Sequence, residues 1–196
     1  MTVYLIRHTE VAVGKSVCYG GSDVQLANNY QEQLVLLRKH LPVSDPDVVF
    51  SSPLTRCRKL AEDLTWSSQR DYVQYDDRLR EYNFGNWEML PWSDIPRDAL
   101  DVWMADFVNL APHNGDSFQG LFDRVCAFWH EQVLPLAEAE TPKTVYLVGH
   151  GGVIRALLCL FLELPLQSAY RLHLDYGAVS KLTILSGTYT VAYINR

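Results

Sequence analysis

Five ionisable side chains stand where the sequence pattern predicts the ends of strands or the starts of helices. They are Arg7, His8, Arg56, Glu81 and His150. A histidine can attack phosphorus, arginines can neutralise phosphoryl oxygens with paired N–H donors, and a carboxyl group can protonate the leaving oxygen. Together these side chains suit phosphoryl transfer without a metal. Singly, each would be an ordinary polar residue, so the interpretation depends on the fold that positions them.

Strands and helices alternate over three quarters of the chain, which is typical of an α/β fold. Apolar runs that predict parallel strands cover residues 1–6, 47–51, 72–75 and 144–148. Helices are predicted over residues 30–40, 52–61, 97–110, 115–138 and 153–164. Closing strands, expected as antiparallel edge strands, cover residues 172–175, 178–186 and 189–194. We therefore expect one domain, residues 1–196, with three α/β/α layers and a mostly parallel sheet.

In a doubly wound sheet the carboxyl ends of the strands meet at one edge, where ligands bind. The polar residues that follow the strands should therefore form one site, although they lie far apart in the chain. Helix N-termini at Ser52-Pro53 and Gly151-Gly152 would add backbone N–H groups for a bound anion. Arginines beside His8 would disfavour its protonated form and leave a lone pair free near neutral pH.

The charge balance argues against several classes of partner. The chain has 17 Lys and Arg against 23 Asp and Glu, a net charge of −6, and no basic run, so neither nucleic acid nor an anionic membrane is expected as a partner. There is no leader sequence and no apolar run of about 18 residues, which predicts a cytoplasmic protein. The cysteines and histidines lack disulfide or metal-ligand spacing, so no metal site is expected.

Five stretches resemble, in this order, the motifs of the histidine phosphatase, or phosphoglycerate-mutase-like, superfamily. They are LIRHTE at 5–10, SSPLTRC at 51–57, DRLREYNFGNWE at 77–88, NGDSF at 114–118 and VGHGGVIRAL at 148–157. Any one stretch alone is a weak signal, but the ordered set is specific. The resemblance implies a phosphoglycerate-mutase-like fold, a small phosphomonoester as substrate, and no metal or organic cofactor.

The resemblance also implies a role for each matching residue. His8 matches the histidine that is phosphorylated during the reaction, and Glu81 matches the general acid, which later activates water. Contacts to the phosphoryl group are implied for Arg7, Arg56, His150 and Gly151.

The chain departs from the common family pattern close to His8. Thr9 stands where most members have glycine, and Gly14 stands where an asparagine is usual. The missing phosphate contacts are expected from the next loop, at Cys18, Tyr19, Gly20 and Ser22. The RHT start followed by CYG and SDV resembles the alpha-ribazole-5′-phosphate phosphatase branch. Alpha-ribazole 5′-phosphate, used in assembly of the cobalamin nucleotide loop, is therefore the expected substrate.

Other functions stay open at this point. A broad-specificity sugar-phosphate phosphatase and a phosphoglycerate mutase would use the same residues, whereas a phospho-ligand binding module would not need both a nucleophile and a proton donor. Hydrolysis is favoured over mutase activity because no basic cluster beyond the arginines could retain a bisphosphorylated intermediate. Aromatic residues near Glu81 could line the substrate site or pack as a lid on the protein body. They are Tyr82, Phe84, Trp87, Trp92 and Trp103.

Overall fold

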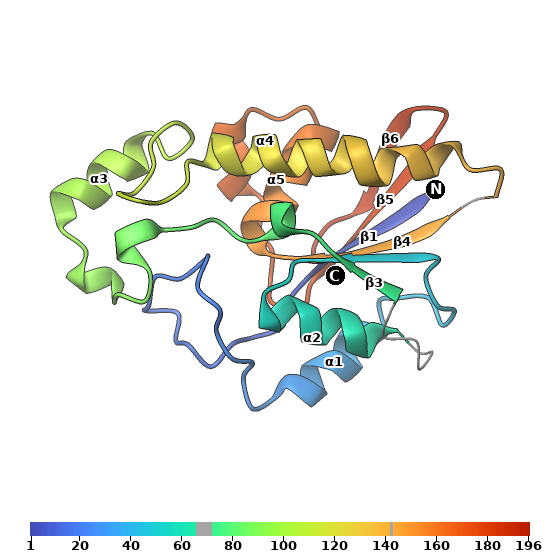
Figure 1. Ribbon diagram of the computed structural model, residues 1–196, viewed down its shortest axis with the longest axis horizontal. Coiled ribbons are helices and arrows are strands. Elements are labelled where there is room, and N and C mark those ends of the chain that lie inside the picture. Colours follow the sequence, from blue (N-terminus) through green and yellow to red (C-terminus); the bar gives the residue numbers. More distant parts are fainter. Residues whose placement is uncertain (66–71, 142) are drawn as a thin grey trace.

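The computed structural model describes residues 1–65, 72–141 and 143–196, and these contain a six-stranded sheet (Figure 1). In spatial order the strands are β3 (Val73–Tyr75), β2 (Val48–Ser51), β4 (Thr144–Gly149), β1 (Thr2–Arg7), β5 (Val179–Leu185) and β6 (Thr188–Tyr193). The strands from β3 to β1 are parallel, and β5 and β6 run antiparallel to their neighbours. The expectation of a mostly parallel sheet with antiparallel edge strands is confirmed.

Helices cover both faces of this sheet and complete a three-layer α/β/α fold (Figure 1). α1 (Tyr30–Arg38) and α2 (Thr55–Leu64) pack on one face, and α4 (Phe118–Phe128) and α5 (Gly151–Phe161) pack on the other. Side chains of β1 alternate between the two cores, because successive residues of a strand point to opposite faces. Val3 and Leu5 join the α4 and α5 side, and Tyr4 and Ile6 join the α1 and α2 side.

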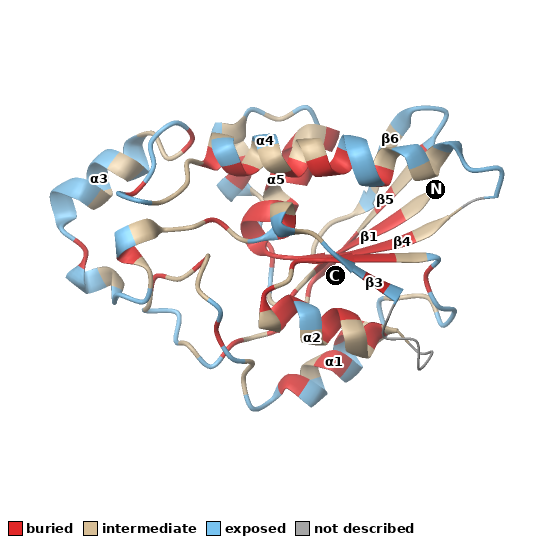
Figure 2. Cartoon of the chain, in the orientation of Figure 1, coloured by how far each residue is buried: buried red, intermediate tan, exposed pale blue. Residues whose placement is uncertain are grey.

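The segment between β3 and α4 carries short helices away from the sheet. α3 (Arg97–Ala105) lies at one end of the molecule and contains no buried residue (Figure 2). Its Trp103 ring packs against Tyr82, Phe84 and Trp87 and so ties α3 to the loop that contains Glu81. The 3-10 turns of this segment are Asp77–Leu79, Gly85–Trp87 and Trp92–Asp94.

Two expected elements differ from the structure because their backbone groups find other partners. Residues 172–175 do not form a strand: the Leu174 carbonyl accepts from Arg7, and the Asp175 N–H donates to the side chain of Asn195. The helix expected from residue 97 to 110 ends at Ala105 because Asp106 leaves the helical conformation, with φ −147° and ψ 55°, and the carbonyls of residues 107 and 108 then accept from the first turn of α4.

Other helix limits shift without changing the topology. α2 begins at Thr55 rather than at Ser52-Pro53, and the Ser52 hydroxyl accepts from the Leu54 N–H just before it. α5 begins at Gly151, two residues before the expected start. After α4 the chain continues as a π-helical turn, Trp129–Val133, and a 3-10 turn, Leu134–Glu138. A 3-10 turn, Leu166–Arg171, follows α5.

The backbone at Gly85 predicts an unequal cost for two glycine substitutions. Gly85 has φ +56°, and an added Cβ would lie 2.1 Å from the His113 carbonyl oxygen. Gly187 has φ +77° with nothing within 4 Å. We expect Gly187→Ala to cost about 1 kcal/mol of unfolding free energy from the left-handed backbone alone, and Gly85→Ala to cost about 3 kcal/mol or more. Urea unfolding of both variants measures the difference, and equal costs would contradict the clash.

Candidate active site

The carboxyl ends of β1 and β4 bring two histidines together. Arg7 pairs with Gly149 in the parallel register of these strands, so His8 and His150 follow at the same level. Their rings pack edge to face, with centroids 5.2 Å apart and planes at 66°. The convergence expected from the strand order is therefore observed.

A cavity of about 210 Å³ opens beside His8. It is lined by Arg7, His8, Lys15, Val17, Tyr19, Arg56, Glu81, Phe84, Trp92 and Tyr176. His150 is fully buried against His8, and neither it nor Gly151 is among the lining residues. The structure thus places the nucleophile candidate, both arginines and the carboxylate around one space, with His150 supporting them from the interior.

His8 has one nitrogen engaged and one free. Its Nδ1 lies 2.7 Å from the Thr9 carbonyl oxygen. A carbonyl can only accept, so Nδ1 carries the hydrogen and Nε2 keeps its lone pair. Burial holds the pKa of His8 well below its ordinary value, and the charges of Arg56 and Arg7 lower the pKa further. The ring is therefore neutral at pH 7, as expected from the neighbouring arginines.

His150 is held by Ser52, in the segment that leads into α2, and by Cys57, in the first turn of that helix. Its Nε2 lies 2.8 Å from the Ser52 hydroxyl and 3.4 Å from the Cys57 sulfur. Burial lowers the pKa of His150 well below its ordinary value, and Arg56 and His8 add to this shift. The second histidine thus offers hydrogen bonding next to His8 without adding charge.

The two arginines are fixed by backbone carbonyls and keep a donor unused. Arg7 Nη1 donates to Leu174 O at 2.5 Å, and Arg56 donates to Gly20 O at 2.6 Å and to Ser22 O at 2.8 Å. Within the described part of the chain, the buried Nε of each arginine has no hydrogen-bond partner. Buried polar groups without a partner are rare, and both of these belong to arginines whose side chains line the cavity.

Glu81 is positioned by backbone N–H groups. Its Oε1 accepts from Tyr82 N at 3.0 Å and its Oε2 from Gly152 N at 2.9 Å. A Cβ at position 152 would lie 2.4 Å from Oε1, so only glycine leaves room for the carboxyl group. The expected N–H group at this helix start is therefore committed to Glu81 and is not free for a bound anion.

The loop after residue 17 supports Arg56, and Glu88 organises this loop. The Glu88 carboxylate accepts from the backbone N–H groups of Gly20, Gly21, Ser22 and Phe84 at 2.8 to 3.1 Å. Burial raises the pKa of Glu88, but these hydrogen bonds outweigh it, and the net pKa is lowered. Glu88 ends one of the quoted sequence motifs, yet its spacing alone gave no sign of a role.

The expected loop residues divide between the cavity and the interior. Tyr19 lines the cavity, while Gly20 and Ser22 act through their carbonyls on Arg56. Cys18 is fully buried in a small cluster with Trp87 and Ile95, so its side chain does not face the cavity.

The aromatic residues near Glu81 also divide in two. Phe84 and Trp92 line the cavity, with ring centroids 5.7 Å apart. Tyr82 and Trp103 pack into the protein, where the Trp103 indole donates to the Tyr82 hydroxyl at 3.1 Å. Part of the cluster therefore lines the cavity and part packs on the protein body.

Sequence reasoning missed Lys15 and Tyr176, which both line the cavity. Both lie in loops without periodicity, and Tyr176 follows the segment that was expected as a strand. The sequence indicates these positions only indirectly. Lys15 follows Gly14 and Tyr176 precedes Gly177, and glycines in loops are common near ligand sites.

Within residues 1–65, 72–141 and 143–196, no group of three or more His, Cys, Asp or Glu side chains is arranged to hold a metal ion. None of the helices in these ranges has the length and hydrophobicity needed to cross a bilayer.

With this fold and this cavity, the chain belongs to the Histidine phosphatase superfamily (branch 1), whose pattern matches residues 3–196. The protein is therefore a phosphomonoesterase of the histidine phosphatase family.

Relatives with known names differ in the substrate that their names give. The adenosylcobalamin/alpha-ribazole phosphatase of Escherichia coli K12 is 28% identical over 199 residues, covering 100% of this chain and 96% of that protein. The glucosyl-3-phosphoglycerate phosphatase of Mycolicibacterium vanbaalenii is 32% identical over 171 residues, covering 84% and 75%. The crystal structure of the alpha-ribazole phosphatase from Shigella flexneri superposes with a TM-score of 0.86 at 28% identity, covering 100% of this chain and 96% of that one.

The two buried neutral histidines predict a loss of stability in mild acid. Because their pKa values are lowered in the folded state, the unfolded chain takes up protons there once the pH falls below about 6.5. Their contribution to stability is full above that pH, and each histidine removes up to about 1.4 kcal/mol per pH unit below it.

Urea unfolding from about pH 7.5 to about pH 5.5 measures this slope. We expect His150→Asn to flatten it by up to about 1.4 kcal/mol per pH unit. His130→Asn, at an exposed position, is the matched control. An unchanged slope in the His150 variant would show that this ring is protonated in the folded protein.

Proposed function

We propose that the protein hydrolyses phosphomonoesters through a phosphohistidine on His8. The lone pair of His8 Nε2 attacks phosphorus, the bond from phosphorus to the ester oxygen breaks, and the carboxyl group of Glu81 gives its proton to that oxygen. Water then attacks the phosphohistidine and loses its proton to Glu81, the P–N bond breaks, and inorganic phosphate leaves. The observation that carries this proposal is the engaged Nδ1 and free Nε2 of a neutral His8 beside two arginines.

Other contacts support the assignment of roles. Arg7 and Arg56 supply positive charge at the phosphoryl oxygens, where charge is spread in the transition state, and they need no metal for this. Glu81 faces the same cavity and is held on both oxygens by backbone N–H groups. His150, with Gly151 after it, orients the His8 ring from the interior side.

We propose alpha-ribazole 5′-phosphate as the substrate. Phe84 and Trp92 add apolar, aromatic lining to the cavity that also contains the arginines, and this lining suits the aromatic base of a ribazole. The named function of the Escherichia coli relative supports the same choice. This substrate would place the enzyme in assembly of the cobalamin nucleotide loop.

One observation favours a second candidate. Lys15 lines the cavity and adds a third cation beside Arg7 and Arg56. A leaving group with a carboxylate, as in glucosyl-3-phosphoglycerate, would pair with an ammonium group at this position. The Mycolicibacterium relative acts, by its name, on that compound.

The mechanism predicts that Glu81→Gln accumulates a phosphoenzyme. With p-nitrophenyl phosphate the leaving group needs little protonation, so this variant should release about one equivalent of nitrophenol per site in a burst. Turnover should then fall about 10² to 10⁴-fold, since no base activates water. Labelled phosphate should be trapped by an alkaline quench, because phosphohistidine is stable in alkali.

Controls separate this result from a general defect. Adding His8→Asn should abolish both the burst and the label, whereas Glu131→Gln, at an exposed ion pair with Arg78, should behave as wild type. If the label persists in the His8 variant, His8 is not the nucleophile. If Glu81→Gln turns over the ester with neither a burst nor trapped label, the reaction does not pass through a phosphohistidine.

The two substrate candidates predict opposite patterns in a pair of variants. Trp92→Ala should lower kcat/KM for alpha-ribazole 5′-phosphate about tenfold and change that for glucosyl-3-phosphoglycerate little. Lys15→Ala should do the reverse, by about tenfold, because it removes a charge-assisted contact. Steady-state kinetics of both variants on both compounds decide. If neither variant discriminates, the enzyme acts on small phosphomonoesters without a leaving-group site.

A further inference from the structure

The segment before β5 places Tyr176 in the lining of the cavity, beside Arg7 and His8. The Tyr176 ring lies under the Arg7 guanidinium, with 4.1 Å from Cζ to the ring centroid, and 5.5 Å from the centroid of the His8 ring. The following Gly177 N–H donates to the His8 carbonyl at 3.0 Å. Tyr176 therefore contacts Arg7, the last residue of β1, and His8, which follows it, although the two segments lie far apart in the chain.

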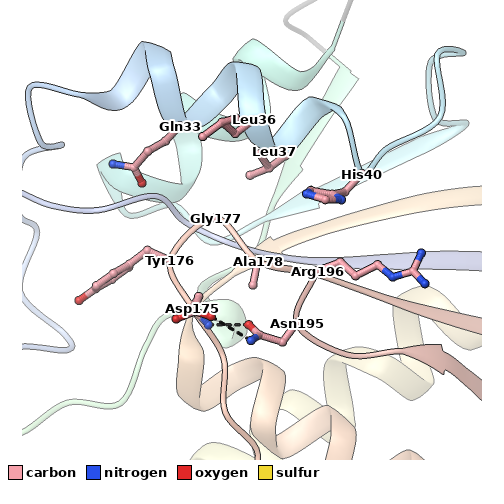
Figure 3. A pocket seen from close by; sticks show the side chains of 10 residues that line it. All are labelled: Gln33, Leu36, Leu37, His40, Asp175, Tyr176, Gly177, Ala178, Asn195 and Arg196. Carbon is pink, nitrogen blue, oxygen red and sulfur yellow. Dashed lines mark hydrogen bonds between the residues drawn. The ribbon is translucent and has the colours of Figure 1, made fainter.

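Neighbouring contacts fix the direction in which Tyr176 points. Asp175 and Asn195 are joined by two hydrogen bonds, from Asp175 N at 2.6 Å and from the Asn195 amide at 2.9 Å. These two residues line a second pocket, of about 190 Å³. In Figure 3, which shows this pocket and the two bonds, the Tyr176 side chain points away from Leu37 and His40. Its ring is directed instead to the cavity beside His8.

The Tyr176 hydroxyl meets a second hydroxyl from the opposite loop. Its oxygen lies 2.8 Å from the Tyr19 hydroxyl oxygen, and Tyr19 also lies near Arg56, 5.6 Å from Cζ to the ring centroid. Burial and the bond to Tyr176 raise the pKa of Tyr19 far above its ordinary value, so this phenol keeps its hydrogen at neutral pH.

A count of hydrogens shows what this pair can still do. Two phenols carry two hydroxyl hydrogens, and one of these is used in the bond between them. Among the described residues, neither hydroxyl has another hydrogen-bond partner. One hydrogen is therefore uncommitted. The pair lines the cavity, with Tyr176 beside Arg7 and Tyr19 near Arg56. Gly14, in the same loop as Tyr19, has no side chain to provide a neutral donor.

We propose that the Tyr19–Tyr176 hydroxyl pair donates its uncommitted hydrogen to a phosphoryl oxygen of the substrate, while the Tyr176 ring holds Arg7 in place. This proposal rests on the phosphatase function proposed above. The mutual bond fixes the direction of the free O–H, so both phenols are needed for one contact. The pair supplies the neutral donor of a phosphate site that is otherwise built from arginines and His8.

The test uses inorganic phosphate as a competitive inhibitor of p-nitrophenyl phosphate hydrolysis. Tyr19→Phe and Tyr176→Phe keep both rings and remove one hydroxyl each. We expect each variant to raise the inhibition constant of phosphate and the KM about tenfold, because the hydroxyl that remains has lost the bond that directs its hydrogen to the phosphoryl oxygen, and a hydrogen bond to a charged group is lost with it. The double variant should be no weaker than the weaker single variant, since the two hydroxyls provide one contact. Tyr176→Leu, which also removes the ring under Arg7, should weaken phosphate about fivefold more than Tyr176→Phe.

The matched control is Tyr30→Phe, which removes a 2.7 Å hydrogen bond to Asp63 away from the cavity. It should lower thermal stability without changing phosphate inhibition. Inhibition constants within twofold of wild type for both single variants would overturn the proposal. So would losses that multiply in the double variant, because these would indicate two independent contacts.

The outcome is separable from that of the proposed function. Combined with Glu81→Gln, the Tyr variants should still accumulate the alkali-stable phosphoenzyme on His8, and its loss with unchanged phosphate inhibition would overturn the pair as a phosphate contact. If Glu81→Gln forms no phosphoenzyme, the proposed phosphohistidine mechanism fails. Phosphate binding in the Tyr variants then still tests the pair, by direct titration.

Discussion

Burial of positive charge without a paired carboxylate is the constraint on which this site depends. Arg56 is fully buried, and within the described part of the chain neither Arg7 nor Arg56 forms a salt bridge. Removing a guanidinium from water costs free energy that backbone carbonyls offset only in part. The loops that provide these carbonyls must therefore be held firmly, and much of the polar structure around the cavity does this. Glu88 gathers the loop under Arg56, and the segment before β5 encloses Arg7.

The same positive charge determines the state of the histidines. Burial and the nearby arginine charges lower the pKa of both histidine rings. Protonating either ring would therefore cost free energy, and both stay neutral. A neutral His8 with a free Nε2 has a lone pair with which it can attack, whereas the same residue in water would be partly protonated. A phosphoryl group would bring the negative charge that the arginines lack. Binding of a phosphoryl group would therefore also lower the free-energy cost of keeping these arginine charges buried.

The sequence predicted the part of the site that depends on strand ends and failed where loops decide. Arg7, His8 and His150 could be placed together because parallel strands end at one edge of the sheet, whatever their side chains. Glu88 and Tyr176 could not, since their roles come from contacts between loops that no periodicity records. Residues 172–175 were wrongly expected as a strand because an apolar, alternating pattern does not reveal that an arginine and an asparagine take the backbone groups. Cys18 was expected near the substrate, but its neighbours Trp87 and Ile95 bury it.

The glycine at position 152 has a consequence for how such a site can change over time. Its missing side chain makes room for a carboxyl group that comes from residue 81, and its N–H holds that carboxyl group in place. A side chain at 152 would push the proposed proton donor aside without touching the nucleophile or the arginines. In the proposed mechanism, a descendant with this single substitution would keep its nucleophile and its arginines but lose the position of its proton donor. One residue on α5 would thus separate hydrolysis from binding alone.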